Sequence, residues 1–136
     1  MNRVEKVLNR ILVVDDEKSI VFAFRHYFVA QGYVVDCAMS AVDALALLGQ
    51  HSYAVAIVDI HLQGLGDESD GLNVAAAIRQ TSPNTIVIIL TALETQETER
   101  RAAEVGVHSY LRKPARLSHV ADIAFAYMRG GLVPAH

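Results

Sequence analysis

The stretch Ile11-Leu12-Val13-Val14-Asp15-Asp16 is a short, β-branched apolar run that stops abruptly at two carboxylates. A continuous apolar run of this length is typical of a strand that is buried on both faces of a parallel sheet. Further runs of the same form occupy residues 54–58 before Asp59, 85–90 before Thr91, and 107–111 shortly before Lys113. Each of these predicted strands therefore leads to a polar residue.

Segments with apolar residues at helical spacing separate these runs. Helices are expected at residues 20–28, 42–48, 72–78, 94–105 and 117–128, and residues 33–37 supply a further strand. Gly32 and Gly49 are typical helix stops, and Ser40 with Asp43 predicts an N-cap. Five strands that alternate with five helices predict a doubly wound α/β fold, because parallel neighbours need crossover connections.

Composition restricts the class of protein further. The 136 residues are 52% hydrophobic and 20% charged, which excludes disordered and collagen-like chains and favours one soluble domain. We expect that domain to span residues 1–136, with a core at about 9–129 and a short tail at 130–136. A formal net charge of -3 disfavours nucleic acid or a membrane surface as a partner. The single Cys37 and the lack of a signal-like or membrane-length apolar segment predict a cytoplasmic location.

The polar residues after the strands are expected to meet, because ligands of open parallel sheets collect at the carboxyl ends of the strands. Bare carboxylates about 4 Å apart repel by roughly 4 kcal/mol at an effective dielectric of about 20. A convergence of Asp15, Asp16 and Asp59 therefore predicts a cation, and all-oxygen ligation favours Mg²⁺. Lys113 would supply the positive charge that a transferred phosphoryl group needs. Taken singly, Asp16 and Thr91 could instead be helix caps, and Lys113 could be a solvated surface residue.

With these residues in place, the chain resembles the response-regulator receiver domains of two-component signalling over residues 9–129. The matching motifs are Ile11-Leu12-Val13-Val14-Asp15-Asp16-Glu17, Val58-Asp59-Ile60-His61-Leu62, Leu90-Thr91-Ala92 and Lys113-Pro114. The resemblance implies a flavodoxin-like (βα)5 fold with a five-stranded parallel sheet in the order 2-1-3-4-5. The bond between Lys113 and Pro114 resembles the family's cis peptide, although trans is the general expectation.

The resemblance also implies the chemistry. Asp59 would accept a phosphoryl group from a histidine kinase or a histidine phosphotransfer domain and form an aspartyl phosphate. The groups expected to hold Mg²⁺ are Asp15, Asp16, an oxygen of Asp59 and the backbone carbonyl of His61. Lys113 would pair with Asp59 or with the phosphoryl oxygens. The chain would be a signalling switch rather than an enzyme, catalysing only its own phosphorylation and autodephosphorylation.

The family pattern further implies how phosphorylation is read. The hydroxyl of Thr91 would move toward the phosphoryl oxygen, and Tyr110 would turn inward, although Tyr110 could also simply cover the edge of the sheet. A downstream protein or an attached output domain would bind the altered surface, and nothing in the sequence names it. A homodimer through the fourth helix, the fifth strand and the fifth helix is a further assembly that the resemblance implies.

The sequence departs from the family pattern at several positions. Gln63 stands where many receivers have proline. The loop at 63–69 is longer than in the family pattern, so the Asp70-Gly71 pair comes about four residues later in the chain than in most receivers. Leu93, beside the expected acyl phosphate, offers no group to orient water, so we expect slow hydrolysis. Ala115 replaces a phenylalanine that follows Lys-Pro in many DNA-binding relatives, which weakens the case for their dimer.

Three other functions compete with this hypothesis. A small phosphohydrolase with an aspartyl phosphate would need an acid/base carboxylate two residues after the nucleophile, where His61 stands. A receiver that only binds partners is disfavoured, because all the motif residues are present. A flavodoxin-like cofactor protein lacks its phosphate loop here, and the acidic residues after the first strand would repel a phosphate. A phosphorylation-controlled switch remains the leading hypothesis.

Overall fold

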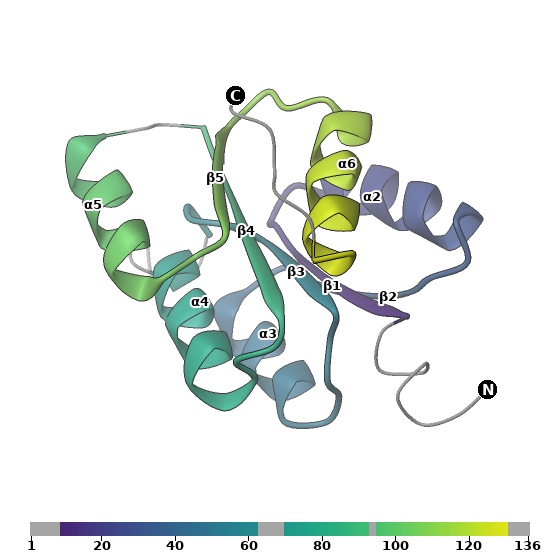
Figure 1. The fold of residues 1–136 in the computed structure, drawn as a ribbon, viewed down its shortest axis with the longest axis horizontal. Coiled ribbons are helices and arrows are strands. Elements are labelled where there is room, and N and C mark those ends of the chain that lie inside the picture. The colour runs from purple at the N-terminus through teal and green to yellow at the C-terminus, as the bar shows by residue number, and fades with distance from the viewer. Residues whose placement is uncertain (1–8, 63–69, 93–94, 131–136) are drawn as a thin grey trace.

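The computed structural model describes residues 9–62, 70–92 and 95–130. They form a three-layer α/β arrangement with a parallel five-stranded sheet in the middle (Figure 1). The strands are β1 (Arg10–Val14), β2 (Val34–Ala38), β3 (Val55–Asp59), β4 (Ile86–Thr91) and β5 (Ser109–Arg112). Their order in the sheet is β2-β1-β3-β4-β5, which confirms the predicted topology.

The helices cover both faces of this sheet. Figure 1 shows α2 (Lys18–Ala30) and α6 (Leu117–Met128) on one face, and α3 (Ala41–Leu48), α4 (Asp70–Thr81) and α5 (Gln96–Val105) on the other. The predicted fourth and fifth helices are therefore α5 and α6. Among the described residues, no helix is both long enough and apolar enough to cross a bilayer.

The strands are buried on both sides, as their continuous apolar sequences predict. Every residue of β3 and β4 is buried. Because side chains alternate across a strand, Ile11 and Val13 enter the core beneath α2 and α6, whereas Leu12 and Val14 enter the core beneath the other helices. The sheet therefore lies between two hydrophobic cores, one on each of its faces.

The helix ends follow the local sequence. Ser40 accepts a hydrogen bond from the Asp43 backbone N–H at 3.1 Å, which confirms the predicted N-cap of α3. Thr95 and Thr98 form a reciprocal capping box at the start of α5. Gly106 ends α5 with a φ of 88°, in the left-handed region that favours glycine.

The last strand begins two residues later than residue 107, where the sequence predicts its start. The backbone N–H of His108 donates to the Val87 carbonyl at 2.9 Å. The Val87 N–H donates in turn to Nδ1 of the His108 ring at 3.0 Å. A side chain rather than a strand partner therefore satisfies this part of β4, and the regular ladder starts only at Ser109.

A polar cluster fastens the edge strand at the other end of the sheet. The Asp36 carboxylate on β2 accepts hydrogen bonds from Arg10 at 2.6 Å and from the Tyr53 hydroxyl at 2.7 Å. Burial acts to raise the pKa of Asp36, but these two hydrogen bonds and the charge of Arg10 leave that pKa below its ordinary value. Burial and the same carboxylate raise the pKa of the Tyr53 hydroxyl.

Candidate functional site

The carboxyl ends of the strands bring the predicted charged residues together. Asp15 follows β1, Asp59 ends β3, and Lys113 follows β5. The Lys113 ammonium lies 2.8 Å from Oδ2 of Asp15, 3.3 Å from Oδ2 of Asp59 and 3.4 Å from Oε1 of Glu17. The side chains of Asp15 and Asp59 are only 2% and 5% exposed, so this ammonium bridges two buried carboxylates.

Local turns orient both carboxylates toward the lysine. Oδ1 of Asp15 accepts a hydrogen bond from the Glu17 N–H at 2.9 Å, just before α2 begins. Oδ1 of Asp59 accepts from the His61 N–H at 3.1 Å. In each residue one oxygen is thus held by the backbone two positions later, and the other oxygen meets Lys113.

Burial and neighbouring charges determine the protonation of this cluster. Burial and the charge of Asp15 raise the pKa of Asp59, although Lys113 acts in the opposite direction. Burial disfavours the ammonium of Lys113, but its hydrogen bond to Asp15 and the charge of Asp59 outweigh that effect and raise its pKa. The lysine therefore stays charged and partly neutralises the two carboxylates.

The chemistry of the donor groups fits a hard cation. Carboxylate oxygens of Asp15, Asp16 and Glu17 all lie within 4.8 Å of one another. Asp15, Glu17 and Asp59 contact the ammonium of Lys113, and Asp16 lies near the first two, so one lysine is matched by several carboxylates and the cluster keeps a negative charge that a cation can balance. Such an all-oxygen set suits Mg²⁺. Glu17, which the sequence analysis did not assign as a ligand, belongs to this group.

Gly71, at the start of α4, lies directly against the end of β3. Its N–H donates to the Ile60 carbonyl at 3.1 Å. A Cβ at this position would lie 2.1 Å from the Asp59 carbonyl oxygen, closer than any side chain tolerates. Glycine is therefore required here by the close approach of two backbones, and the Asp-Gly pair in the sequence was the signal for it.

The predicted switch residues lie on β4 and β5. Thr91 is fully buried at the end of β4, and the neighbouring Ala92 is exposed. Tyr110 is half-buried on β5, and its hydroxyl lies 2.9 Å from Oγ1 of Thr98 on α5. The sequence analysis did not single out Thr98, although the Thr-x-x-Thr pattern of a capping box was visible. Leu93 and the loop at 63–69 lie outside the described residues.

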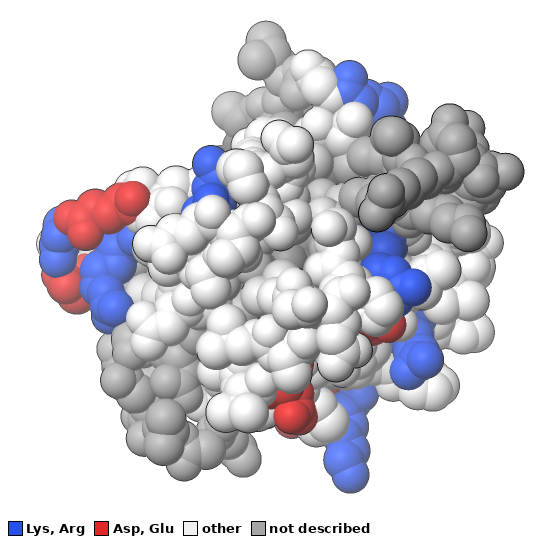
Figure 2. Space-filling view, turned by 90° about the horizontal axis from the view of Figure 1, so that it is seen from below, with Lys and Arg blue, Asp and Glu red and all other residues white. Residues whose placement is uncertain are grey.

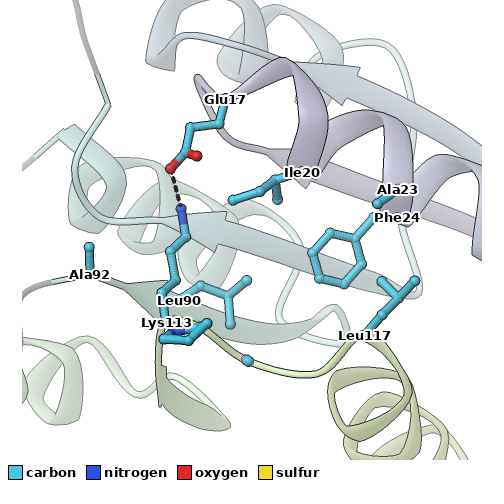
Figure 3. A pocket seen from close by; sticks show the side chains of 10 residues that line it. Glu17, Ile20, Ala23, Phe24, Leu90, Ala92, Lys113 and Leu117 are labelled. Carbon is cyan, nitrogen blue, oxygen red and sulfur yellow. Dashed lines mark hydrogen bonds and ion pairs between the residues drawn. The ribbon is translucent and has the colours of Figure 1, made fainter.

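A cleft of about 470 Å³ opens beside the cluster, between α2 and the connection from β5 to α6 (Figure 3). Figure 3 shows Lys113 reaching toward Glu17 at one end of this cleft, with Ile20, Phe24 and Leu117 around its apolar part. Ala115 also lines it. The cleft therefore joins an apolar surface to the charged site.

Fold and site together define a flavodoxin-like α/β domain with an acidic cluster and a lysine at the carboxyl edge of its sheet. The family model described as "Response regulator receiver domain" matches residues 11–124, and the chain belongs to this family. The predicted identity as a receiver domain of two-component signalling, a family of signalling switches, is confirmed.

The relatives include longer proteins. The chain is 38% identical over 105 residues to the alginate biosynthesis transcriptional regulatory protein AlgB of Pseudomonas aeruginosa, covering 77% of this chain and 22% of that protein. It is 30% identical over 120 residues to the response regulator MprA of Mycobacterium sp. strain KMS, covering 88% of this chain and 50% of MprA. The chain therefore spans at most about half of the length of these two relatives.

A solved structure with the same fold is a CheY-like receiver domain protein from Methanospirillum hungatei JF-1. The TM-score is 0.83 at 23% sequence identity, and the match covers 90% of this chain and 95% of that one. This likeness shows the shared fold.

Proposed function

We propose that Asp59 accepts a phosphoryl group from a phosphohistidine donor and that the resulting aspartyl phosphate changes the partner-binding surface of the domain. The observation that carries this proposal is the ammonium of Lys113, which lies between the buried carboxylates of Asp15 and Asp59. A histidine kinase or a histidine phosphotransfer domain would be the donor, as in the two-component systems to which the family belongs.

The transfer itself needs alignment and charge neutralisation more than covalent assistance. An oxygen of Asp59 attacks phosphorus, the P–N bond to the donor imidazole breaks, and the imidazole leaves with the electron pair of that bond and takes up a proton. Lys113 keeps its charge throughout. Its bond to Asp15 holds it in place while Asp59 is consumed, so the same ammonium can then pair with a phosphoryl oxygen.

Mg²⁺ is the cofactor that this site supports best. The residues proposed to hold it are Asp15, Asp16, an oxygen of Asp59 and the backbone carbonyl of His61, with Glu17 close to the same group. When bound, the ion would neutralise charge on the phosphoryl oxygens. Asp16 is half-buried and Glu17 is exposed, so solvent can supply the remaining waters that Mg²⁺ prefers to keep.

The proposed switch uses residues of the two strands beyond β3. Thr91, at the end of β4, would bond the new phosphoryl oxygen, and Tyr110, on β5, would follow that movement. The outward side of α5 is charged, and Arg100 pairs there with Glu97 and Glu104. Figure 2 shows acidic and basic side chains gathered in the region of α5, beside a largely uncharged surface. A homodimer through α5, β5 and α6 would use this charged side, and it remains a proposal.

Intact-protein mass spectrometry after incubation with Mg²⁺ and a small acyl phosphate tests the proposal. We expect one phosphoryl increment that requires the metal and is absent from Asp59→Asn. Asp122→Asn, which changes an exposed carboxylate on α6, is the matched control and should retain the increment. An increment that persists in Asp59→Asn, or a native chain that takes no phosphoryl group from either the acyl phosphate or a phosphohistidine donor, would overturn the assignment.

A further inference from the structure

A chain of hydroxyl groups joins Tyr110 on β5 to the first turn of α5. The Tyr110 hydroxyl lies 2.9 Å from Oγ1 of Thr98. Thr98 in turn accepts a hydrogen bond from the Thr95 N–H at 3.2 Å and donates to the Thr95 carbonyl at 3.1 Å. The Thr98 N–H donates to Oγ1 of Thr95 at 3.1 Å, which closes the capping box. One threonine hydroxyl is therefore part of both the helix cap and the contact with the aromatic ring.

The Thr98 hydroxyl is shared among several neighbours. A threonine hydroxyl has one hydrogen and two lone pairs. The Thr95 N–H donates to one lone pair, and the Thr95 carbonyl, the Thr95 hydroxyl and the Tyr110 hydroxyl lie within hydrogen-bond distance of the same oxygen. Either Thr98 or Tyr110 can be the donor in the bond between them, and in both cases the bond joins β5 to the first turn of α5.

The hydrogen bond between Tyr110 and Thr98 involves a buried residue of α5. Thr98 is only 2% exposed, and Thr98 and Ala102 are the buried residues of this helix. The other residues in the first turn are charged or polar and face solvent. If Tyr110 leaves, the Thr98 hydroxyl keeps its contacts with Thr95 but the first turn of α5 loses a hydrogen bond that joins it to β5. The first turn of α5 therefore depends on where Tyr110 points.

We propose that Thr98 is a positioning residue for Tyr110. It holds the aromatic side chain against α5, and inward rotation of Tyr110 breaks the hydrogen bond and loosens the capped first turn of α5. The rotation of one ring is thereby converted into a change at a charged helix surface. This inference rests on the proposed switch role of Tyr110, but it adds a residue and a direction of coupling to that role.

The test follows Tyr110 by fluorine NMR in protein labelled with 3-fluorotyrosine. The chain has five tyrosines, so Tyr110→Phe identifies the signal. The activating probe is beryllofluoride with Mg²⁺, which imitates a phosphoryl group on a carboxylate. We expect Thr98→Val to shift the Tyr110 signal, without any additive, toward the position that beryllofluoride produces in the native chain. Thr98→Ser keeps the hydroxyl and should leave the signal at its native position.

Amide hydrogen exchange measures whether the first turn of α5 loosens when Tyr110 moves. In the native chain, beryllofluoride should speed exchange in the first turn of α5 about fivefold, the factor that one ordinary hydrogen bond is worth. In Tyr110→Phe this exchange should already be fast and should not respond further. Thr95→Ala is the matched control: it removes the N-cap side chain and should speed exchange without moving the Tyr110 signal.

Two results would overturn the inference. One is a folded Thr98→Val protein whose Tyr110 signal coincides with that of Thr98→Ser. The other is an exchange response of Tyr110→Phe equal to that of the native chain. If the native chain neither takes up phosphoryl nor responds to beryllofluoride, the proposed function fails, whereas the comparison of Thr98→Val with Thr98→Ser without additive still decides whether Thr98 positions Tyr110.

Discussion

Replacing Gly71 with alanine should disrupt the acidic site through the backbone alone. The new Cβ would lie 2.1 Å from the Asp59 carbonyl oxygen and 2.5 Å from Cα of Ile60. Ordinary contact begins at 3.4 Å, so the start of α4 and the end of β3 would have to separate by about 1.3 Å. That movement also breaks the hydrogen bond from the Gly71 N–H to the Ile60 carbonyl. We expect a loss of about 3 kcal/mol in the free energy of unfolding, at the upper end for overpacking.

The effect on chemistry should be larger than the effect on stability. Displacing a reacting group by about 1 Å typically costs about 100-fold in rate, and Asp59 is attached to the backbone that must move. We therefore expect phosphoryl uptake from a small acyl phosphate, followed by intact mass in buffer without denaturant, to slow by about that factor. Urea unfolding of the same samples measures the stability.

Gly49→Ala is the matched control for this experiment. Gly49 follows α3 with a φ of -73°, and a Cβ there would meet its nearest atoms at 3.5 and 3.8 Å, which is ordinary contact. We expect it to change stability by less than about 1 kcal/mol and to leave phosphoryl uptake unchanged. A Gly71→Ala protein that takes up phosphoryl as fast as Gly49→Ala would refute the argument from backbone contact.

Three further predictions concern the fold. Burial disfavours the charged ring of His108 and lowers its pKa below the ordinary value of 6.5. The neutral ring therefore contributes fully to the free energy of unfolding above pH 6.5, and this contribution is lost as the pH falls through the lower pKa of the folded protein. His108→Phe should therefore make the urea midpoints at about pH 8 and about pH 5 more alike. If the difference between the two midpoints is unchanged, His108 is not a source of the pH dependence. Tyr53→Phe should cost about 1 kcal/mol, because Asp36 loses a donor but keeps its arginine, and an unaltered thermal midpoint would count against that bond. Phe28 is 0% exposed, so Phe28→Ala should cost about 3 to 5 kcal/mol in urea unfolding, and a loss below about 1 kcal/mol would mean that the core repacks.

Much of the fold could be predicted because its signals are local. The apolar run at Ile11–Val14 and its counterparts are short, continuous and separated by helical spacing, so the alternation of strands and helices follows from the chain itself. The start of β5 could not be predicted in this way. The His108 ring accepts a backbone hydrogen bond from β4, 21 residues away in the chain, and no local pattern contains that contact.

The candidate site shows the same division. Sequence alone was enough to place Asp15, Asp59 and Lys113 at strand ends on one edge of the sheet, because parallel strands present their carboxyl ends together. The inclusion of Glu17 beside Lys113 depended on where α2 begins. Thr98 was visible in the sequence only as part of a cap, since nothing local shows that a β5 side chain reaches it.

The sequence by itself determined the order and kind of the elements and the polar residues that follow the strands, because periodicity and turn chemistry act over a few neighbouring residues. Only the tertiary structure decided which atoms meet. Lys113 and Asp15 are 98 positions apart in the chain, yet their side chains touch. Contacts of that kind depend on the register of the whole sheet and on how closely the helices pack against it.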